Sequence, residues 1–398
     1  MKIGTITLHL PFNYGNALQQ FALHKYLLKQ GYDTEILSHW YLKNKEEIRY
    51  YHNDLQSSFK RILPFILHCM MFNGVFVQYI REKKINKWMT EHIKWSEKEG
   101  TDETFPATEI DHDVVITGSD QIWNPIHATS DYFLLYKFPS HIRKIAYAAS
   151  LGSDVFPETR EPFYKKALAD FEAISVRESS AVSILERMGV DSTLVCDPTL
   201  LHTREEWIEM LGIKRKQKTE NGIMMYFVSP AHRIYWKDVI QVAKGSKKKI
   251  HVYVFSHTPM VKCSLVPVKR AVKLFLTNIY IRFRLFFAGV RLHFSADPTE
   301  FVQRLSESEG LITDSFHGLM FASIFEKKCN VVIGTHAERI QMSARLRNFI
   351  HDFSNPEILS PTIDAASMRT VKITPALQSL IEKSKQWLEK SLEKSQRN

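Results

Sequence analysis

His317 lies in a segment where a histidine could exchange a proton with an anion. The run Gly310-Leu-Ile-Thr-Asp-Ser-Phe-His-Gly-Leu-Met-Phe-Ala-Ser-Ile-Phe325 predicts a buried strand, a sharp polar turn and a helix. Asp314 and Ser315 are natural caps, because their side-chain oxygens can accept the free N–H groups of the first helical turn. His317 would lie at the positive end of that helix, which attracts anions. The segment therefore indicates phosphoryl, carboxyl or glycosyl chemistry, with His317 suited to act as a general acid.

Arg177 is the second residue that could act on an anion, because it directly follows a predicted buried strand. Its planar guanidinium suits bidentate capture of a carboxylate or a phosphate. The alternative is a structural salt bridge to Glu178 or to another nearby acid.

Further polar residues follow other predicted strands, and ligands of open α/β sheets collect beyond the carboxyl ends of strands. The loop Asn13–Asn16 could offer N–H groups to an anion or a sugar, or be an ordinary turn; its single glycine excludes a dinucleotide fingerprint. Trp123 could stack on a sugar ring or close the contact between domains. Lys144 could add positive charge. The predicted substrate-binding residues are Asn13, Tyr14, Gly15, Asn16, Gly118, Ser119, Asp120, Trp123, Lys144, Ser150, Asp314 and Ser315.

The elements that must position these residues alternate between apolar strands and helices along both halves of the chain. This pattern predicts parallel sheets that are covered on both faces. We expect one α/β domain over residues 1–205, with a helical insertion at about 40–100, and a second over residues 206–398. The charged amphipathic helix at 374–398 is expected to pack back across the domains. Two such domains would place a ligand site between them.

Composition and charge narrow the function classes. The chain has 398 residues, of which 44% are hydrophobic and 24% charged, so it can form normal globular cores. Its formal net charge of +10 favours an anionic substrate or partner. Four widely spaced cysteines predict neither a disulfide framework nor a zinc site. The N-terminus reads as a strand rather than a signal peptide, so we expect a cytoplasmic protein.

Two stretches could contact a membrane. Residues 62–80 contain no Asp, Glu, Lys or Arg, and they approach the length of a membrane span. Residues 271–294 interleave basic and aromatic side chains. Packed helices, with a solvated basic face in the second stretch, are the alternative to peripheral contact with the inner membrane face.

The chain resembles the polysaccharide pyruvyl transferase family in a set of motifs that occur in the family's order. They are Asn13-Tyr-Gly-Asn16 with Leu18-Gln-Gln20, Gly118-Ser-Asp-Gln-Ile-Trp-Asn124, Tyr147-Ala-Ala-Ser-Leu-Gly152, Ser175-Val-Arg-Glu178, Asp197-Pro-Thr-Leu200 and Thr313-Asp-Ser-Phe-His-Gly318. The resemblance implies two Rossmann-like domains facing a cleft, similar to GT-B glycosyltransferases. It also implies transfer of a pyruvyl group from phosphoenolpyruvate (PEP) to two hydroxyls of a glycan, which forms a ketal in cell-surface or exopolysaccharide biosynthesis.

The resemblance implies His317 as the general acid and Arg177 as the residue that holds the PEP anions. It implies no metal and no cofactor besides the donor PEP. The glycan acceptor could be lipid-linked, and no nucleic acid is expected as a partner. Two alternatives stay open: a GT-B glycosyltransferase with a nucleotide-sugar donor, for which Glu326 could bind the ribose, and a non-catalytic homologue that binds glycan or membrane.

Overall fold

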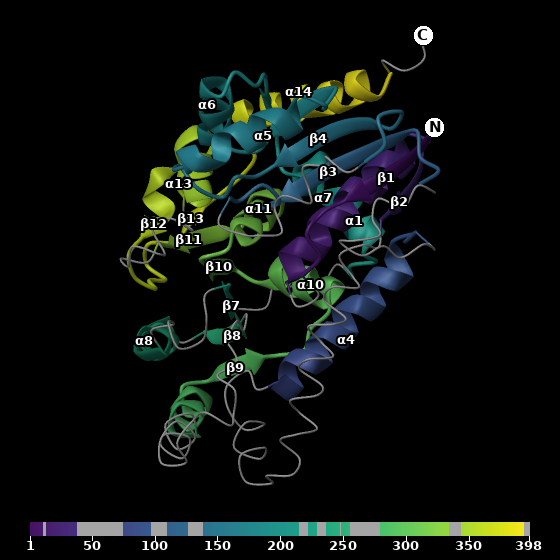
Figure 1. Ribbon diagram of the computed structural model, residues 1–398. Coiled ribbons are helices and arrows are strands. Elements are labelled where there is room, and N and C mark those ends of the chain that lie inside the picture. The colour runs from purple at the N-terminus through teal and green to yellow at the C-terminus, as the bar shows by residue number, and fades with distance from the viewer. Residues whose placement is uncertain are drawn as a thin grey trace, which may run out of the picture.

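Two parallel sheets form the framework of the protein (Figure 1). The computed structural model describes residues 1–10, 13–37, 75–96, 110–125, 138–214, 222–228, 236–246, 248–254, 279–333 and 344–393. The expected membrane-contacting residues 62–74 and 271–278, and much of the expected insertion at 40–100, lie outside these ranges. Among the described residues, no helix is both long enough and apolar enough to cross a bilayer.

The first sheet has the order β2-β1-β3-β4-β5-β6, and all its strand pairs are parallel. Its strands are β1 (Lys2–Ile6), β2 (Asp33–Ile36), β3 (Val114–Asp120), β4 (Arg143–Ala149), β5 (Ala173–Val176) and β6 (Thr193–Leu194). All seven residues of β3 are buried, as expected for a central parallel strand with both faces covered. The helices of this half are α1 (Tyr14–Lys29), α4 (Val75–His92), α5 (Glu161–Leu168) and α6 (Ser179–Arg187).

The second sheet has the order β12-β11-β10-β7-β8-β9, with β13 paired antiparallel to β11. Its strands are β7 (Gly222–Phe227), β8 (Lys249–Val254), β9 (Val290–His293), β10 (Gly310–Thr313), β11 (Lys328–Val332), β12 (Leu359–Ser360) and β13 (Arg369–Thr370). The helices that follow β6 are α7 (Arg204–Met210), α8 (Trp236–Ser246), α10 (Pro298–Glu307), α11 (Phe316–Ile324), α13 (Ala344–Phe353) and α14 (Pro375–Glu393). Two Rossmann-like domains are thus confirmed, and the expected division at residue 205 lies between their sheets.

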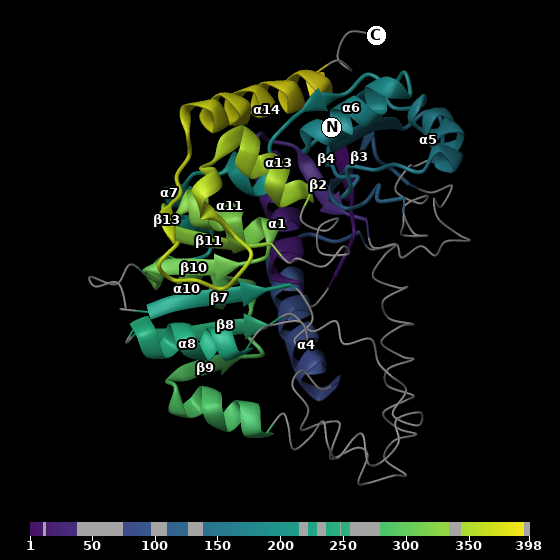
Figure 2. The same cartoon turned by 90° about the vertical axis from the view of Figure 1, so that its left-hand side faces the viewer.

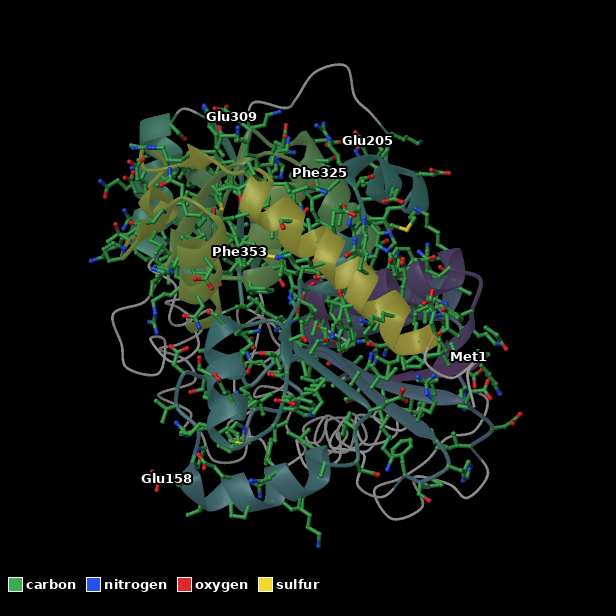
Figure 3. The ribbon with its side chains drawn as sticks, turned by 90° about the horizontal axis from the view of Figure 1, so that it is seen from above. Met1, Glu158, Glu205, Glu309, Phe325 and Phe353 are labelled. Atoms are coloured by element: carbon green, nitrogen blue, oxygen red, sulfur yellow. The ribbon has the colours of Figure 1, made fainter. Side chains whose placement is uncertain are left out.

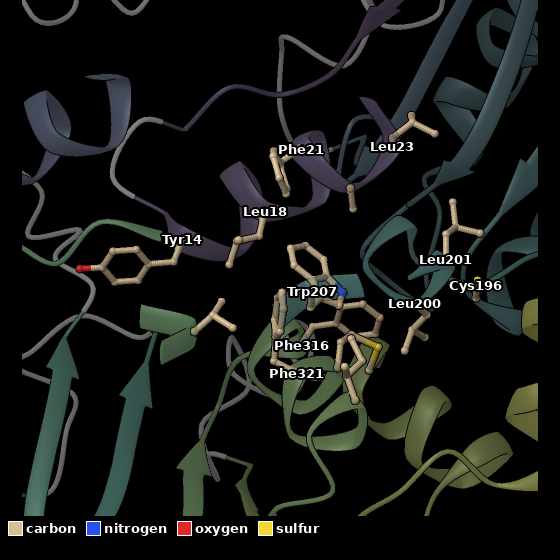
Figure 4. Packing of buried hydrophobic residues seen from close by; sticks show 14 of the residues in the cluster. Tyr14, Leu18, Phe21, Leu23, Cys196, Leu200, Leu201, Trp207, Phe316 and Phe321 are labelled. Carbon is tan, nitrogen blue, oxygen red and sulfur yellow. The ribbon is translucent and has the colours of Figure 1, made fainter. Parts of the chain in front are cut away.

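One hydrophobic core spans both domains. Leu18 and Phe21 of α1 belong to the same buried cluster as Phe316 and Phe321 of α11. Trp207 joins them, because its ring lies 5.9 Å from that of Phe21 and 4.9 Å from that of Phe321 (Figure 4). This shared core brings the N-terminal ends of α1 and α11 together.

The C-terminal helix α14 packs back onto the first domain, as expected (Figures 2 and 3). Ser384 Oγ accepts a hydrogen bond from the backbone N–H of Cys196 at 2.8 Å. Arg143, at the start of β4, donates to the backbone oxygen of Ser391 at 2.7 Å. The end of the chain therefore contributes to the packing of the first sheet.

Candidate active site

The N-terminal turn of α11 presents His317 at the junction of the two domains. Ser315 is the N-cap, and its hydroxyl accepts the backbone N–H of Gly318 at 3.2 Å, as predicted. Asp314 does not cap α11, because its carboxylate instead accepts the backbone N–H of Val228 at 2.7 Å after β7. Among the described residues, no acceptor pairs with the backbone N–H of Phe316 or His317. The start of α11 therefore keeps the free donors and the positive dipole end that favour an anion.

The first turn of α1 lies directly against the imidazole of His317. Asn13 caps α1 and accepts the backbone N–H of Asn16 at 3.3 Å. Gly15 has no side chain at this contact, and a Cβ placed on it would lie 2.5 Å from Nδ1 of His317. Glycine is required here because the backbone of α1 approaches the ring so closely. Two helix N-termini, one from each domain, thus converge on His317.

Asp197 is the acidic partner of His317. Its Oδ2 lies 3.6 Å from Nε2 of His317, and both side chains are buried. Asp197 is fixed in turn because its Oδ1 accepts the backbone N–H of Thr199 at 3.0 Å. Burial opposes ionisation of Asp197, but His317 and Arg177 outweigh it and hold its pKa well below the usual range. A carboxylate so placed can orient an imidazole and stabilise the imidazolium.

Arg177 is surrounded by carboxylates, so the predicted capture of PEP by this side chain has no support in the geometry. Its Nη1 donates to Asp197 at 2.6 Å, its Nη2 donates to Asp120 at 3.2 Å, and its Nε lies 3.5 Å from Glu178. Its side chain is 0% exposed. The structure thus shows Arg177 in the alternative arrangement, an ion pair with Glu178 and with two further acids.

Asp120 contacts residues of both domains. Its Oδ2 accepts Nδ2 of Asn16 at 3.0 Å, and its Oδ1 lies 3.6 Å from Nη1 of Arg345 on α13. Burial raises the pKa of Asp120, but Arg177, His317 and Arg345 outweigh burial and lower it to about 2. Arg345 was not predicted as a site residue, because no motif surrounds it in the sequence. Burial lowers its pKa to about 10, and Arg177 contributes to that shift by repulsion.

Residues of β3 and β4 complete the polar cluster. Ser119 Oγ donates to Asp197 at 3.3 Å and accepts from Nη1 of Arg177 at 3.3 Å. Gly118 has a φ of 149°, and a Cβ there would lie 1.9 Å from the carbonyl oxygen of Tyr147. Only glycine therefore fits at this turn.

Glu178 is the third acid of the cluster. Ser150 Oγ donates to its carboxylate. Burial raises the pKa of Glu178. From the sequence, Glu178 was expected only as a possible salt-bridge partner of Arg177, and Asp197 only as part of a motif.

Three predicted site residues lie elsewhere. Trp123 is 0% exposed and packs edge-on against Phe171 in the core of the first domain, so it neither stacks on a sugar nor closes the domains. Lys144 lies at the amino end of β4, where it donates to the backbone oxygen of Phe138 at 3.1 Å and pairs with Asp170.

Tyr14 is buried between the domains, where its ring stacks on Phe301 with the centroids 4.8 Å apart. It holds the interface and does not face a ligand. Within the described part of the chain, no group of three or more His, Cys, Asp or Glu side chains is arranged to hold a metal ion.

Comparisons with known proteins agree with this arrangement. A sequence profile of the polysaccharide pyruvyl transferase family matches residues 13–336 of the 398. No curated protein sequence matches the chain.

Among solved structures, UDP-GlcNAc 2-epimerase from Neisseria meningitidis, bound to UDP-GlcNAc, superposes with a TM-score of 0.50 at 13% identity. The match covers 99% of this chain and 100% of that one. The Methanocaldococcus jannaschii UDP-GlcNAc 2-epimerase gives 0.46 at 11% identity, covering 99% and 93%, and Acinetobacter baumannii MurG gives 0.40 at 8%, covering 100% and 95%. The fold is that of the GT-B enzymes, as expected.

Proposed function

Because the chain belongs to the polysaccharide pyruvyl transferase family, we propose that it moves a pyruvyl group from PEP to two hydroxyls of a glycan. The product is a cyclic ketal, and phosphate is released. The observation that carries this proposal is the position of His317, which lies between two helix N-termini and beside Asp197. Such a site can bind an anion and exchange a proton with it.

The proposed reaction needs two proton transfers. The terminal carbon of PEP gains a proton and becomes a methyl group, which leaves C2 as an oxocarbenium-like electrophile. One sugar hydroxyl attacks C2, the bond from C2 to the phosphate oxygen breaks, and the second hydroxyl closes the ketal. Of the two hydroxyl protons, one balances the new methyl hydrogen and the other leaves on the phosphate. PEP is the only co-substrate, and the chain's own residues supply the proton transfers.

His317 is the proposed general acid, and it protonates either the terminal carbon or the departing phosphate. Asp197, at 3.6 Å, would keep the imidazole oriented and stabilise it once it is protonated. The free N–H groups at the start of α11 would bind the phosphate or the carboxylate of PEP.

Arg345 is the proposed cation for the PEP anions, in place of Arg177. Its side chain is 13% exposed and lies 3.6 Å from one carboxylate, whereas Arg177 is fully buried among three. The side-chain amide of Gln121 also lies against the guanidinium of Arg345. Arg345 comes from the second domain and meets Asp120 of the first. We assign the acceptor side of the proposed site to the polar residues Asn13, Asn16 and Ser119.

The residue that supports the nucleotide-sugar alternative lies at the opposite end of α11 from His317. Glu326 follows the C-terminal end of α11, whereas His317 lies in its first turn. A nine-residue helix is about 13 Å long, so Glu326 lies far from the convergent helix N-termini. No observation on the described residues favours a non-catalytic glycan-binding role over catalysis.

Phosphate release from PEP tests the proposal. The assay offers aryl and lipid-linked galactosides, mannosides and N-acetylmannosaminides, with wild type beside His317→Asn. We expect acceptor-dependent release that falls by about 10³-fold or more in the variant, because the proton donor is lost. The control is Arg347→Lys on α13, which replaces a partly exposed residue paired with Asp154 and should keep full activity. If no acceptor supports release and PEP does not raise the melting temperature, the PEP donor is wrong and nucleotide sugars are to be tested.

A further inference from the structure

A patch of exposed aromatic side chains lies on the helical residues 279–287, which precede β9. Tyr280 is 61% exposed, Phe283 59%, Phe286 74% and Phe287 78%. Among the described residues, these four are the only large aromatic side chains with such exposure. Soluble proteins seldom leave so much contiguous apolar surface without a use for it.

The four rings form one surface rather than scattered contacts. Positions 280, 283 and 287 share one face of a helix because they are three and four residues apart. The rings of Phe283 and Phe287 stack at 6.1 Å, and Phe286 meets Phe287 edge-on at 5.6 Å. The guanidinium of Arg284 lies 5.7 Å from the ring of Tyr280.

The opposite face of this helix already has its partner. Leu285 is 1% exposed and belongs to the core of the second domain, and Ile281 packs against the same core. The exposed rings are therefore not needed to attach the helix to the sheet. The helix lies next to β9, the edge strand of the second sheet, at the margin of the molecule (Figures 1 and 2).

The positive charge near the aromatic patch indicates that its binding partner is anionic. The described residues 279–296 include three arginines, Arg282, Arg284 and Arg291, and no Asp or Glu. Arg284 is within the patch, and Arg291 follows on β9. Aromatic rings beside arginines suit the headgroup region of an anionic bilayer, where the rings insert and the cations attract lipid phosphates.

We propose that residues 279–287 form a docking surface for an anionic membrane. The rings of Phe283, Phe286 and Phe287 enter the headgroup region, and Arg284 remains among the lipid phosphates. This binding is independent of the proposed transfer reaction, because none of these residues belongs to the His317 site.

Vesicle flotation tests the proposal. The full chain is mixed with vesicles of phosphatidylcholine, alone or with phosphatidylglycerol, and compared with Phe283→Ser/Phe286→Ser/Phe287→Ser. We expect wild type to float with the anionic vesicles only, and the triple variant to lose binding by about tenfold or more. The matched control is Val155→Ser, which removes an apolar side chain that is 70% exposed on the first domain, and it should float like wild type.

Two results would overturn the proposal. One is wild type that stays at the bottom of the gradient with both vesicle types. The other is a triple variant that floats as well as wild type while its melting temperature is unchanged. If wild type instead sediments as a dimer that the triple substitution dissociates, and no vesicle binds, the patch contacts a second copy of the chain rather than lipid.

Discussion

The two domains contribute unlike charges to the site. The first supplies all three acids of the cluster together with one cation that they enclose: Asp120, Glu178, Asp197 and Arg177. The second supplies the imidazole and a cation, His317 and Arg345. The second domain therefore adds positive charge that offsets part of the negative charge of the first. The proposed catalytic centre is made by the contact between domains and does not exist within either one.

The two arginines of the cluster differ in their partners and in their exposure. Arg177 is fully buried and pairs with acids of its own domain. Arg345 reaches across to Asp120 and keeps some exposure. We therefore expect Arg177 to matter for folding and Arg345 to matter for the donor.

The largest predicted effect is that of Arg177→Met on stability. Removing the cation leaves Asp120 and Asp197 buried without their main partner, so the free energy of unfolding should fall by about 3–5 kcal/mol. Arg345→Met should cost about 1 kcal/mol in stability but weaken PEP binding by about tenfold or more, since a charge-assisted contact is lost. Urea unfolding measures the first quantity, and the rise of melting temperature with PEP concentration measures the second.

Equal stability losses in the two variants would contradict the assignment. So would a PEP response in Arg345→Met that matches wild type. Arg347→Met provides a matched control on the same helix, because its ion pair with Asp154 lies at the surface.

The next effect is that of Gly15→Ala on catalysis. The added methyl would lie 2.5 Å from Nδ1 of His317, so the imidazole must leave its present position beside Asp197. We expect acceptor-dependent phosphate release to fall by about 10²-fold, because small misplacements of a catalytic group are costly. Gly245→Ala on α8 is the control, since a Cβ there meets nothing within 4 Å. An active Gly15→Ala variant would show that His317 does not need this position.

Local sequence predicted the parts of the site that depend on neighbouring residues. Ser315 at the helix start and His317 two residues later follow from capping preferences within one segment. The acids around Arg177 could not be predicted in this way, because Asp120 and Asp197 reach it only through the packing of β3 and of the turn after β6. The prediction that Lys144 lies at the site could have been avoided. Lys144 is the second residue of its strand, and the amino end of a parallel strand lies at the edge opposite to the ligands.

The smallest predicted effect is on acid stability. The pKa of Asp120 falls from an ordinary value of 3.8 to about 2 in the folded state, so its ionised form stabilises the fold. That contribution is complete above about pH 4 and is lost as the pH falls through about 2. It amounts to about 2 kcal/mol, since one pKa unit corresponds to about 1.4 kcal/mol. Urea unfolding of wild type at pH 5 and near pH 2 should show this loss, and Asp120→Asn should reduce it; an identical pH dependence in both would refute the assignment.

The packing of α14 on the first domain has a consequence for how the chain matures during synthesis. Tyr26, Arg143 and Cys196 of the first domain each form hydrogen bonds with residues 384–392. The domain that is synthesised first therefore gains these hydrogen bonds only after the second domain and α14 have been synthesised. Nascent chains that stop before Pro375 would leave the surface under α14 exposed to chaperones and proteases.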